Sequence, residues 1–429
     1  MLDATWLFDG REVPHLPVPP PGPRAQAYLD RDDEFVSPSY TRVYPLVVAR
    51  GSGCVIEDVD HNLYLDFTAG IAVTATGHCH PHVVAAIQDQ ASKLLHMSGT
   101  DFYYAPQVDL AQRLAEAVGP GRRVFFTNSG TESLEAALKL SRKRTGRSRV
   151  ISFFGSFHGR TYGGMSLSGS KLVHRRGFGP LVPDIHHVPY PKAGESGAAC
   201  VAAIEDTVLK RTAPPEEVAA VFVEPIQGEG GYRVPPPDFL PALRALCDKH
   251  GIMLVADEVQ SGMGRTGKMF ACQHFGIEPD IVCLAKGIAS GMPLGAIVSK
   301  SEIMDWPPGS HASTFGGNPV SCRAALATMD LLEAGYTRNA HERGEQLRTG
   351  LKRLAARHGE IGDVRGLGLM TAMDLPSDRC RNEVVQEAFV RGLLLLGCGE
   401  SAIRFCPPLC VTAAQVETCL GILDGVLLR

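Results

Sequence analysis

Residues Gly251–Gly291 read GIMLVADEVQSGMGRTGKMFACQHFGIEPDIVCLAKGIASG, and the rest of the chain is organised around this stretch. It contains two short apolar runs, at 252–256 and 281–285, of the kind that forms buried strands in an α/β sheet. The first run leads into Asp257 and the second into Lys286. Functional groups in such sheets gather outside the carboxyl ends of the strands. The stretch therefore predicts a carboxylate and an amine at one edge of a sheet.

Two interpretations of this pair follow from the residues alone. A buried lysine is costly unless a partner or a reaction retains it, so Asp257 and Lys286 can form a structural ion pair. A desolvated lysine amine is also a good nucleophile toward carbonyl groups. Both interpretations stay open at this point.

Length and composition set the broad class. A chain of 429 residues exceeds the ~250–300 at which one core stops growing, so we expect two lobes. A formal net charge of −4 gives no indication of nucleic acid or of an anionic membrane surface as partner. No uninterrupted apolar stretch reaches the ~18 residues of a membrane span, and the N-terminus lacks the pattern of a signal peptide. The 12 scattered cysteines predict reduced core thiols and a cytoplasmic protein.

The N-terminal part of the chain is rich in proline. Residues 13–23, VPHLPVPPPGP, contain six prolines and are incompatible with helix or central strand. We therefore expect residues 1–43 to form an extended arm. Compact structure is predicted to begin near Tyr44, with a hairpin over Val55–Phe67.

A histidine cluster follows in the stretch GIAVTATGHCHP, residues 70–81, and the residue after it. His78, His80 and His82 lie two positions apart, a spacing that suits neither one face of a helix nor a zinc knuckle. We expect no metal site here. A turn before a helix that begins near Pro81 is the favoured interpretation.

Residues 124–143, VFFTNSGTESLEAALKLSRK, predict a strand, a turn at Asn128-Ser129-Gly130, and a helix. Such a junction offers free backbone N–H groups and the positive end of the helix dipole, which together bind anions. An ordinary helix capped by Ser129 and Glu132 is the alternative. No Walker lysine follows Gly130, which disfavours a nucleoside triphosphate.

Further polar groups follow other predicted strands. The loop GSFHGR, residues 155–160, brings together an aromatic ring, an imidazole and a guanidinium, which suit a flat ring and a carboxylate. Glu224 follows an apolar run at 219–223, and STFGGN, residues 313–318, is another turn before a helix. Beyond it the composition indicates a C-terminal α+β lobe.

Seven motifs in this order resemble the class III aminotransferases, pyridoxal-phosphate enzymes that act on 4-aminobutyrate, ornithine and acetylornithine. The motifs are NSGTES, FHGRT, VEPIQGEGG, DEVQSGMGRTGK, LAKGIASGMPLGA, STFGGNP and IRFCPPL, and the match runs from about Pro45 onward. The resemblance implies an α/β protein of the PLP-dependent transferase fold type I. We expect a large domain with a mostly parallel central sheet and a smaller α+β domain built from both termini. The expected limits are an arm at 1–43, a first part of the small domain at 44–80, the large domain at 81–325 and the C-terminal small domain at 326–429.

The resemblance also implies a set of cofactor contacts. Lys286 would carry the cofactor and then move the proton, and Asp257 would hold the pyridine nitrogen protonated. A homodimer or dimer of dimers is implied as well, because one of the residues would reach the phosphate of the neighbouring subunit. The remaining contacts would be the phosphate cradle of Ser129, Gly130 and Thr131, the ring neighbours Phe157, His158 and Gln260, and the cross-subunit residue Thr314.

The implied reaction transfers an amino group from an ω-amino or diamino acid to 2-oxoglutarate. Arg404 would bind the carboxylate next to the reacting carbon, Arg160 a distal carboxylate, and Glu224 would pair with Arg404 when that carboxylate is absent. Ile71, which stands where ornithine enzymes carry a tyrosine, favours 4-aminobutyrate over free ornithine, with acetylornithine next. An amino-acid racemase or epimerase with the same cofactor is the alternative function. A catalytically silent binding protein is disfavoured, because the lysine, the aspartate and both arginines are present.

Overall fold

The computed structural model describes residues 4–428, and its centre is a seven-stranded sheet. The strand order is β4-β10-β9-β8-β7-β5-β6, parallel except for β10, which runs antiparallel to both of its neighbours. The predicted mostly parallel central sheet is therefore confirmed. The strands are β4 (Arg122–Thr127), β5 (Arg149–Phe153), β6 (Ile185–Val188), β7 (Val218–Val223), β8 (Met253–Asp257), β9 (Ile281–Leu284) and β10 (Gly295–Lys300).

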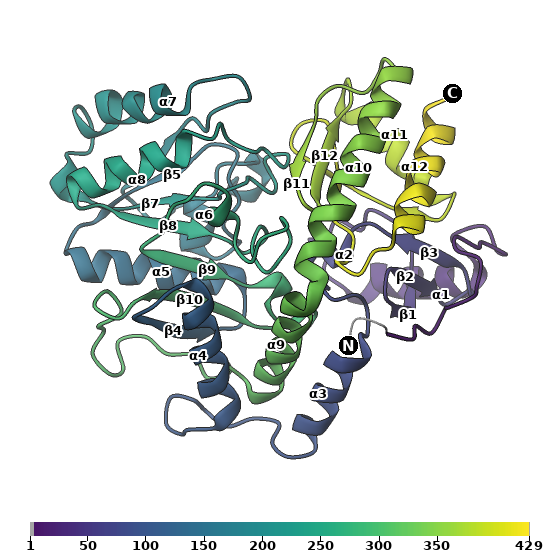
Figure 1. The fold of residues 1–429 in the computed structure, drawn as a ribbon, viewed down its shortest axis with the longest axis horizontal. Coiled ribbons are helices and arrows are strands. Elements are labelled where there is room, and N and C mark those ends of the chain that lie inside the picture. The colour runs from purple at the N-terminus through teal and green to yellow at the C-terminus, as the bar shows by residue number, and fades with distance from the viewer. Residues whose placement is uncertain (1–3, 429) are drawn as a thin grey trace.

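Helices cover both faces of this sheet, which explains why its central strands read as continuous apolar runs. Every residue of β7, β8 and β9 is buried. On one face the core joins β5, β7 and β8 to α7 (Gly197–Ile204) and α8 (Phe239–His250). On the other face α5 (Gly130–Thr145) packs over β7, β8, β9 and β10. Figure 1 shows α7 and α8 on one side of the sheet and α5 on the other.

Segments from both ends of the chain build two four-stranded sheets beside this domain. In the first, β13 (Leu393–Leu394) pairs parallel with β3 (Leu63–Asp66), so that distant parts of the sequence share one sheet. The domain limits expected above are not tested by this pairing and stay predictions. The other strands are β1 (Val48–Ser52) and β2 (Val55–Asp58) in the first sheet, and β11 (Val364–Leu367), β12 (Met370–Asp374), β15 (Ala402–Phe405) and β14 (Leu396–Cys398) in the second.

The proline-rich arm differs from its prediction. Within the described part of this arm, residues 4–43, the chain is not extended throughout, because α1 (Pro23–Phe35) is a helix of 13 residues. Residues 1–3 of the predicted arm lie outside the described residues. Pro23 occupies the first helical turn, where its missing N–H costs no hydrogen bond, so proline starts this helix instead of preventing it. Upstream, His15 forms a single antiparallel bridge with Leu63 of β3.

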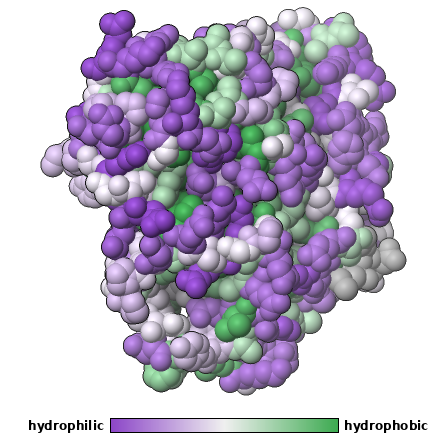
Figure 2. Space-filling view, turned by 60° about the vertical axis from the view of Figure 1, so that its left-hand side comes forward, coloured by the Kyte–Doolittle hydropathy of each residue, from purple (hydrophilic) through white to green (hydrophobic). Residues whose placement is uncertain are grey.

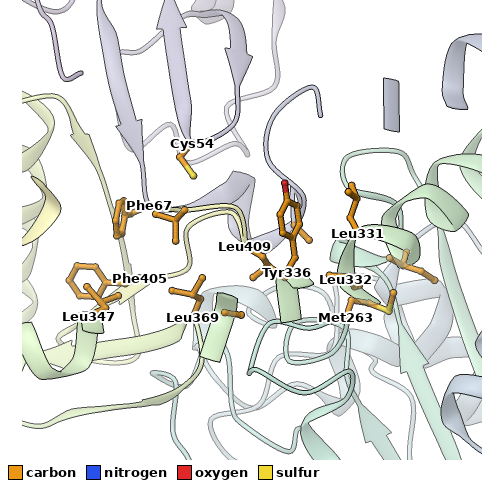
Figure 3. Packing of buried hydrophobic residues seen from close by; sticks show 14 of the residues in the cluster. Cys54, Phe67, Met263, Leu331, Leu332, Tyr336, Leu347, Leu369, Phe405 and Leu409 are labelled. Carbon is orange, nitrogen blue, oxygen red and sulfur yellow. The ribbon is translucent and has the colours of Figure 1, made fainter. Parts of the chain in front are cut away.

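A long apolar core joins the two parts of the molecule. Figure 3 shows Phe405 of β15 in the same cluster as Met263 and Leu332, together with Phe67, Leu369 and Leu409 from the segments next to the strands of the small sheets. The helices α9 (Pro319–Leu331) and α10 (Thr337–Arg357) run one after the other between the two halves in Figure 1. The remaining helices are α2 (Ala69–Ala72), α3 (Pro81–Ala91), α4 (Ala105–Val118), α6 (Tyr162–Leu167), α11 (Asp378–Phe389) and α12 (Ala413–Leu427).

The surface is dominated by hydrophilic residues on the face drawn in Figure 2, where hydrophobic residues appear as small separate patches. None of the helices in residues 4–428 is long and apolar enough to cross a membrane. The predicted start of a helix at Pro81 is confirmed by α3. The hairpin predicted over Val55–Phe67 is confirmed by the antiparallel pairing of β2 with β3.

Candidate active site

The carboxyl ends of the parallel strands open onto one cavity of about 380 Å³. Asp257 ends β8, Glu224 follows β7, and Lys286 lies two residues after β9, so the acid and the amine meet at one sheet edge. Most of the other predicted site residues line the same cavity. They are Ser129, Gly130, Thr131, Phe157, His158, Arg160 and Gln260.

The two residues that define this edge do not pair with each other. Asp257 is buried and pairs with His158, whose Nδ1 lies 2.7 Å from Oδ2 of Asp257. The other carboxylate oxygen accepts a hydrogen bond of 3.0 Å from the backbone N–H of Val259. Burial alone would lower the pKa of His158, but the adjacent Asp257 carboxylate outweighs burial and raises it. The Asp257 carboxylate therefore favours the protonated form of the His158 imidazole.

Lys286 has an environment that favours its neutral amine. Burial lowers the pKa of Lys286, although the carboxylates of Glu229 and Asp257 oppose this shift. Its φ is 45°, a left-handed conformation in which the strand end turns sharply into the next segment. Among residues 4–428 no carboxylate lies within salt-bridge distance of its amine. A neutral, unpaired lysine amine is a competent nucleophile.

The start of α5 has the geometry of an anion site. Ser129 caps the helix, and its Oγ accepts a hydrogen bond of 3.4 Å from the backbone N–H of Glu132. Glu132 does not complete the predicted capping box, because its carboxylate accepts from the backbone and side chain of Asn128 instead. A Cβ atom at Gly130 would lie 2.8 Å from Val259, so the chain passes too closely there for a side chain. Backbone N–H groups and the helix dipole thus face the cavity.

The ion pair of Arg404 corrects one prediction. Nη1 of Arg404 lies 2.5 Å from Oε1 of Glu229, so Glu229 and not Glu224 is its partner. Glu224 accepts instead from the backbone N–H groups of Phe157, at 2.8 Å, and Gly228, at 2.7 Å. Burial raises the pKa of Glu224 to about 7, with the His158 charge opposing the shift.

The physical reason is the position of each acid along the chain. Glu224 follows directly on β7, where its carboxylate reaches the amides of two adjacent loops. Glu229 lies in the glycine-flanked turn QGEGG, whose backbone touches the small sheets, since Glu229 O accepts a hydrogen bond of 2.8 Å from Gly399 N. The sequence feature that could have indicated Glu229 is its position between Gly228 and Gly230 in the motif VEPIQGEGG.

The family described as Aminotransferase class-III matches residues 35–427 of this chain. The chain belongs to the class-III aminotransferases. Its architecture is accordingly that of fold type I, with the large mostly parallel sheet and the additional small sheets described above.

Several known proteins are similar to this class-III aminotransferase. Acetylornithine aminotransferase of Caldanaerobacter subterraneus subsp. tengcongensis is 38% identical over 92% of this chain and 98% of its own length. The 4-aminobutyrate aminotransferase GabT of Escherichia coli is 39% identical over 92% of this chain and 96% of its own. The alanine/serine racemase of Pyrococcus horikoshii is 37% identical over 96% and 92%. An amine transaminase from an uncultivated Pseudomonas species, solved in its PLP-bound form, has a TM-score of 0.85 at 33% identity and covers 92% of this chain and 98% of its own.

The residues that line the cavity of this class-III aminotransferase fit pyridoxal phosphate in their chemistry. Two buried polar atoms at the cavity, Oε1 of Gln260 and Nε2 of His158, have no hydrogen-bond partner in the described structure. Such atoms are costly unless a bound group or water satisfies them. The start of α5 suits a phosphate, Asp257 a protonated ring nitrogen, and Lys286 a carbonyl carbon.

Three predicted site residues of the class-III aminotransferase do not line the cavity. Arg404 lies behind Glu229, Thr314 is exposed on the surface, and Ile71 is 43% exposed on α2. Val73, two residues after Ile71, lines the cavity in place of Ile71. Glu229 and Val73 are therefore among the cavity residues that the sequence did not predict, as are Met292, Pro293 and Leu294.

Proposed function

We propose that this class-III aminotransferase moves the amino group of an ω-amino or diamino acid to 2-oxoglutarate, with pyridoxal phosphate as its cofactor. A donor like 4-aminobutyrate is the first choice, and acetylornithine or ornithine comes next. The observation that carries the proposal is the buried ion pair between Arg404 and Glu229 beside Lys286.

The chain's own residues have distinct tasks in this proposal. When bound, pyridoxal phosphate supplies an electron sink for the substrate carbon that loses a proton. Lys286 holds the cofactor through its amine and carries the proton to and from that carbon. Asp257 keeps the ring nitrogen protonated, and His158 orients Asp257 through the contact of 2.7 Å.

Further contacts fix the cofactor's position. Ser129, Gly130 and Thr131 take the phosphate at the start of α5. Gln260 directs its unpartnered oxygen or its amide N–H groups to the phenolic edge of the ring. Phe157, which lines the cavity, covers the ring face.

The Arg404–Glu229 pair suits an enzyme that accepts two kinds of substrate. While Glu229 occupies Arg404, the arginine charge is neutralised, and an amine without a nearby carboxylate can approach Lys286. A 2-oxodiacid displaces Glu229 and binds the freed guanidinium with its own carboxylate, in a charge-assisted contact. Arg160 is exposed at the cavity and stacks over the Phe157 ring at 5.6 Å, where it can take the distal carboxylate.

The apolar part of the cavity supports a donor with a methylene chain. Its lining includes Val73, Met292, Pro293 and Leu294. Such a wall contributes only about 1–3 kcal/mol of discrimination per methylene group, so closely related donors compete.

Amino-donor profiling tests the proposal. Turnover of 4-aminobutyrate, acetylornithine and ornithine is measured with 2-oxoglutarate or pyruvate as acceptor. A chiral assay of alanine and serine without any oxo acid runs beside it. Strict dependence on 2-oxoglutarate supports the proposal, whereas interconversion of enantiomers without an oxo acid favours the racemase alternative. No residue contact in the described structure favours that alternative.

We further propose that the active unit is a homodimer or a dimer of dimers. Thr314 is exposed in the single chain and does not line its own cavity. Its task in this proposal is to contact the phosphate held by the other subunit, so that each site is completed by two copies.

A further inference from the structure

Four successive residues, Ala69 to Ala72, have left-handed backbone conformations. Their φ values are 48°, 60°, 67° and 59°, and only the second residue, Gly70, is a glycine. The residues on either side, Thr68 and Val73, return to negative φ. Consecutive left-handed residues with a Cβ atom are rare, because the side chain approaches the following carbonyl oxygen. Residues 69–72, labelled α2 in Figure 1, therefore form a strained left-handed turn.

One buried carboxylate holds the start of this turn. Asp66, which is 1% exposed, accepts three hydrogen bonds with its Oδ1 atom: from Thr68 N and Thr68 Oγ1, both at 2.7 Å, and from Ala69 N at 3.2 Å. Its Oδ2 atom lies 2.8 Å from Nε2 of His78. Asp66 thus gives a partner to the backbone N–H groups of Thr68 and Ala69, at the start of the left-handed turn.

The two ends of the turn are tied to the segment that follows Arg404. Phe67 O accepts a hydrogen bond of 2.9 Å from Cys406 N, and Ala75 O accepts one of 2.8 Å from Leu409 N. Cys406 lies two residues after Arg404. The turn and the strand that carries Arg404 are therefore joined by backbone contacts.

The residue that leaves the turn lines the active-site cavity. Val73 N donates to Ala69 O at 2.8 Å, which fixes its backbone directly on the turn. Its side chain lines the cavity together with Met292 and Leu294. If the same residues formed a right-handed turn, the chain would leave the turn in a different direction, and Val73 would no longer lie in this wall.

We propose that Asp66 is a positioning residue, which holds the left-handed turn at 69–72 and thereby sets the apolar substrate wall at Val73. The identity of the substrate in this inference rests on the proposed function, because the wall would contact the methylene chain of the amino donor. A strained backbone conformation persists only where surrounding contacts hold it in place, and here the hydrogen bonds of Asp66 supply such contacts.

Steady-state kinetics of Asp66→Ala test the positioning role. The KM for the amino donor should rise about tenfold, while kcat and the visible absorbance of bound cofactor stay close to wild type. Asp66→Asn should restore most of the KM, because its amide oxygen can still accept from Thr68 and Ala69. A fall in kcat with unchanged KM, loss of cofactor absorbance, or no rescue by Asp66→Asn would overturn the role. Should Asp66→Ala be insoluble, His78→Gln is judged by the same KM criterion with a smaller expected rise.

Thermal unfolding tests the turn without any substrate. A Cβ atom at Gly70 or at the control Gly421 would meet no atom within 4 Å, so only backbone conformation distinguishes the two sites. Gly421 lies in the right-handed helix α12, where alanine is favoured over glycine. Gly70→Ala should lower Tm and Gly421→Ala should raise it. Equal increases would refute the strained turn, whereas absence of any transamination by the wild type would refute only the proposed function.

Discussion

His158 Nδ1 lies 2.7 Å from Asp257 Oδ2, and both side chains are buried at the end of strand β8. The contact gives the carboxylate a cationic neighbour on one side while its remaining surface faces the cavity. The same contact holds the carboxylate in a fixed orientation toward the cavity.

Asp257→Asn removes the charge and keeps the shape of the side chain. We expect the variant to retain cofactor but to lose about a hundredfold or more in kcat, because a ring nitrogen is no longer held protonated. Absorbance of the bound cofactor and single-turnover rates measure the two effects separately. A nearly wild-type rate would show that Asp257 is only structural.

Lys286→Ala removes the amine at the end of β9. The purified wild-type protein should be yellow, and the variant should lose both the corresponding absorbance band and turnover. Lys352→Ala, at an exposed position of α10, is the matched control and should retain both. Retention of the band and of activity in Lys286→Ala would refute its assignment.

Arg404→Ala separates the two half-reactions. The KM for 2-oxoglutarate should rise steeply, because the carboxylate next to the reacting carbon loses its guanidinium partner. The half-reaction with 4-aminobutyrate, whose carboxylate is assigned to Arg160, should be largely spared. Arg379→Ala, exposed on α11, should change neither.

Equal damage to both half-reactions would contradict this division. Glu229→Gln provides a complementary measurement, because it weakens the partner that competes for Arg404. The KM for 2-oxoglutarate should fall in this variant. The same substitution at Glu224, which does not pair with Arg404, should not lower that KM.

Two buried groups, Glu224 and His158, should each contribute less to stability as the pH rises toward and above neutrality. Burial raises the pKa of Glu224 from its usual 4.5 to about 7, and Asp257 raises that of His158 above its usual 6.5 despite burial. At these two groups the folded state therefore binds more protons than the unfolded state in this window, so their contribution to stability falls as the protons leave. The stabilising contribution of protonated Glu224 is fully present below pH 4.5 and is lost as the pH rises through about 7.

Thermal unfolding of the cofactor-free protein between pH 5 and pH 8 measures this dependence. Glu224→Gln should gain Tm relative to the wild type between pH 5 and pH 7, because it lacks this loss. Glu216→Gln, at an exposed site, should show the same dependence as the wild type. A Tm difference between Glu224→Gln and the wild type that fails to increase from pH 5 to pH 7 would contradict this contribution of Glu224.

Thr314→Ala should weaken cofactor retention through the neighbouring subunit. A cofactor that binds only the dimer favours dimerisation, so the cofactor-free protein should dissociate at higher concentration than the loaded protein. Sedimentation combined with an activity assay measures both. Thr418→Ala, on α12, should behave as wild type. A fully active monomer at low concentration would exclude a shared site.

The parts of the site that could be predicted from the sequence follow local rules. Asp257 and Lys286 end short buried runs, and Ser129 precedes a periodic helix, so each signal lies within a few neighbouring residues. The antiparallel direction of β10 between two parallel strands depends instead on distant pairing with β4 and β9. No local pattern encodes that direction.

The predictions that failed, and the features that no pattern predicted, have three separate causes. Glu229 reaches Arg404 because the loop after β7 meets the small sheets, a contact between residues 175 positions apart. The left-handed conformation of Ala69, Ile71 and Ala72 has no signal in residue type, because alanine and isoleucine disfavour it. The helix in the proline-rich arm begins where proline is tolerated, which a proline count alone does not reveal.

Arg160 and Arg404 lie on different bodies of the protein, the first in the loop after β5 and the second on β15 of the small sheet. Under their proposed roles, the span between the two carboxylates of a substrate is fixed by how these bodies pack. With those roles, the apolar core shown in Figure 3 would set the length of diacid that fits, although it is remote from any atom that the substrate touches. A change of volume at Leu369 or Phe405 would alter which chain length is accepted, while the chemistry at Lys286 stays the same.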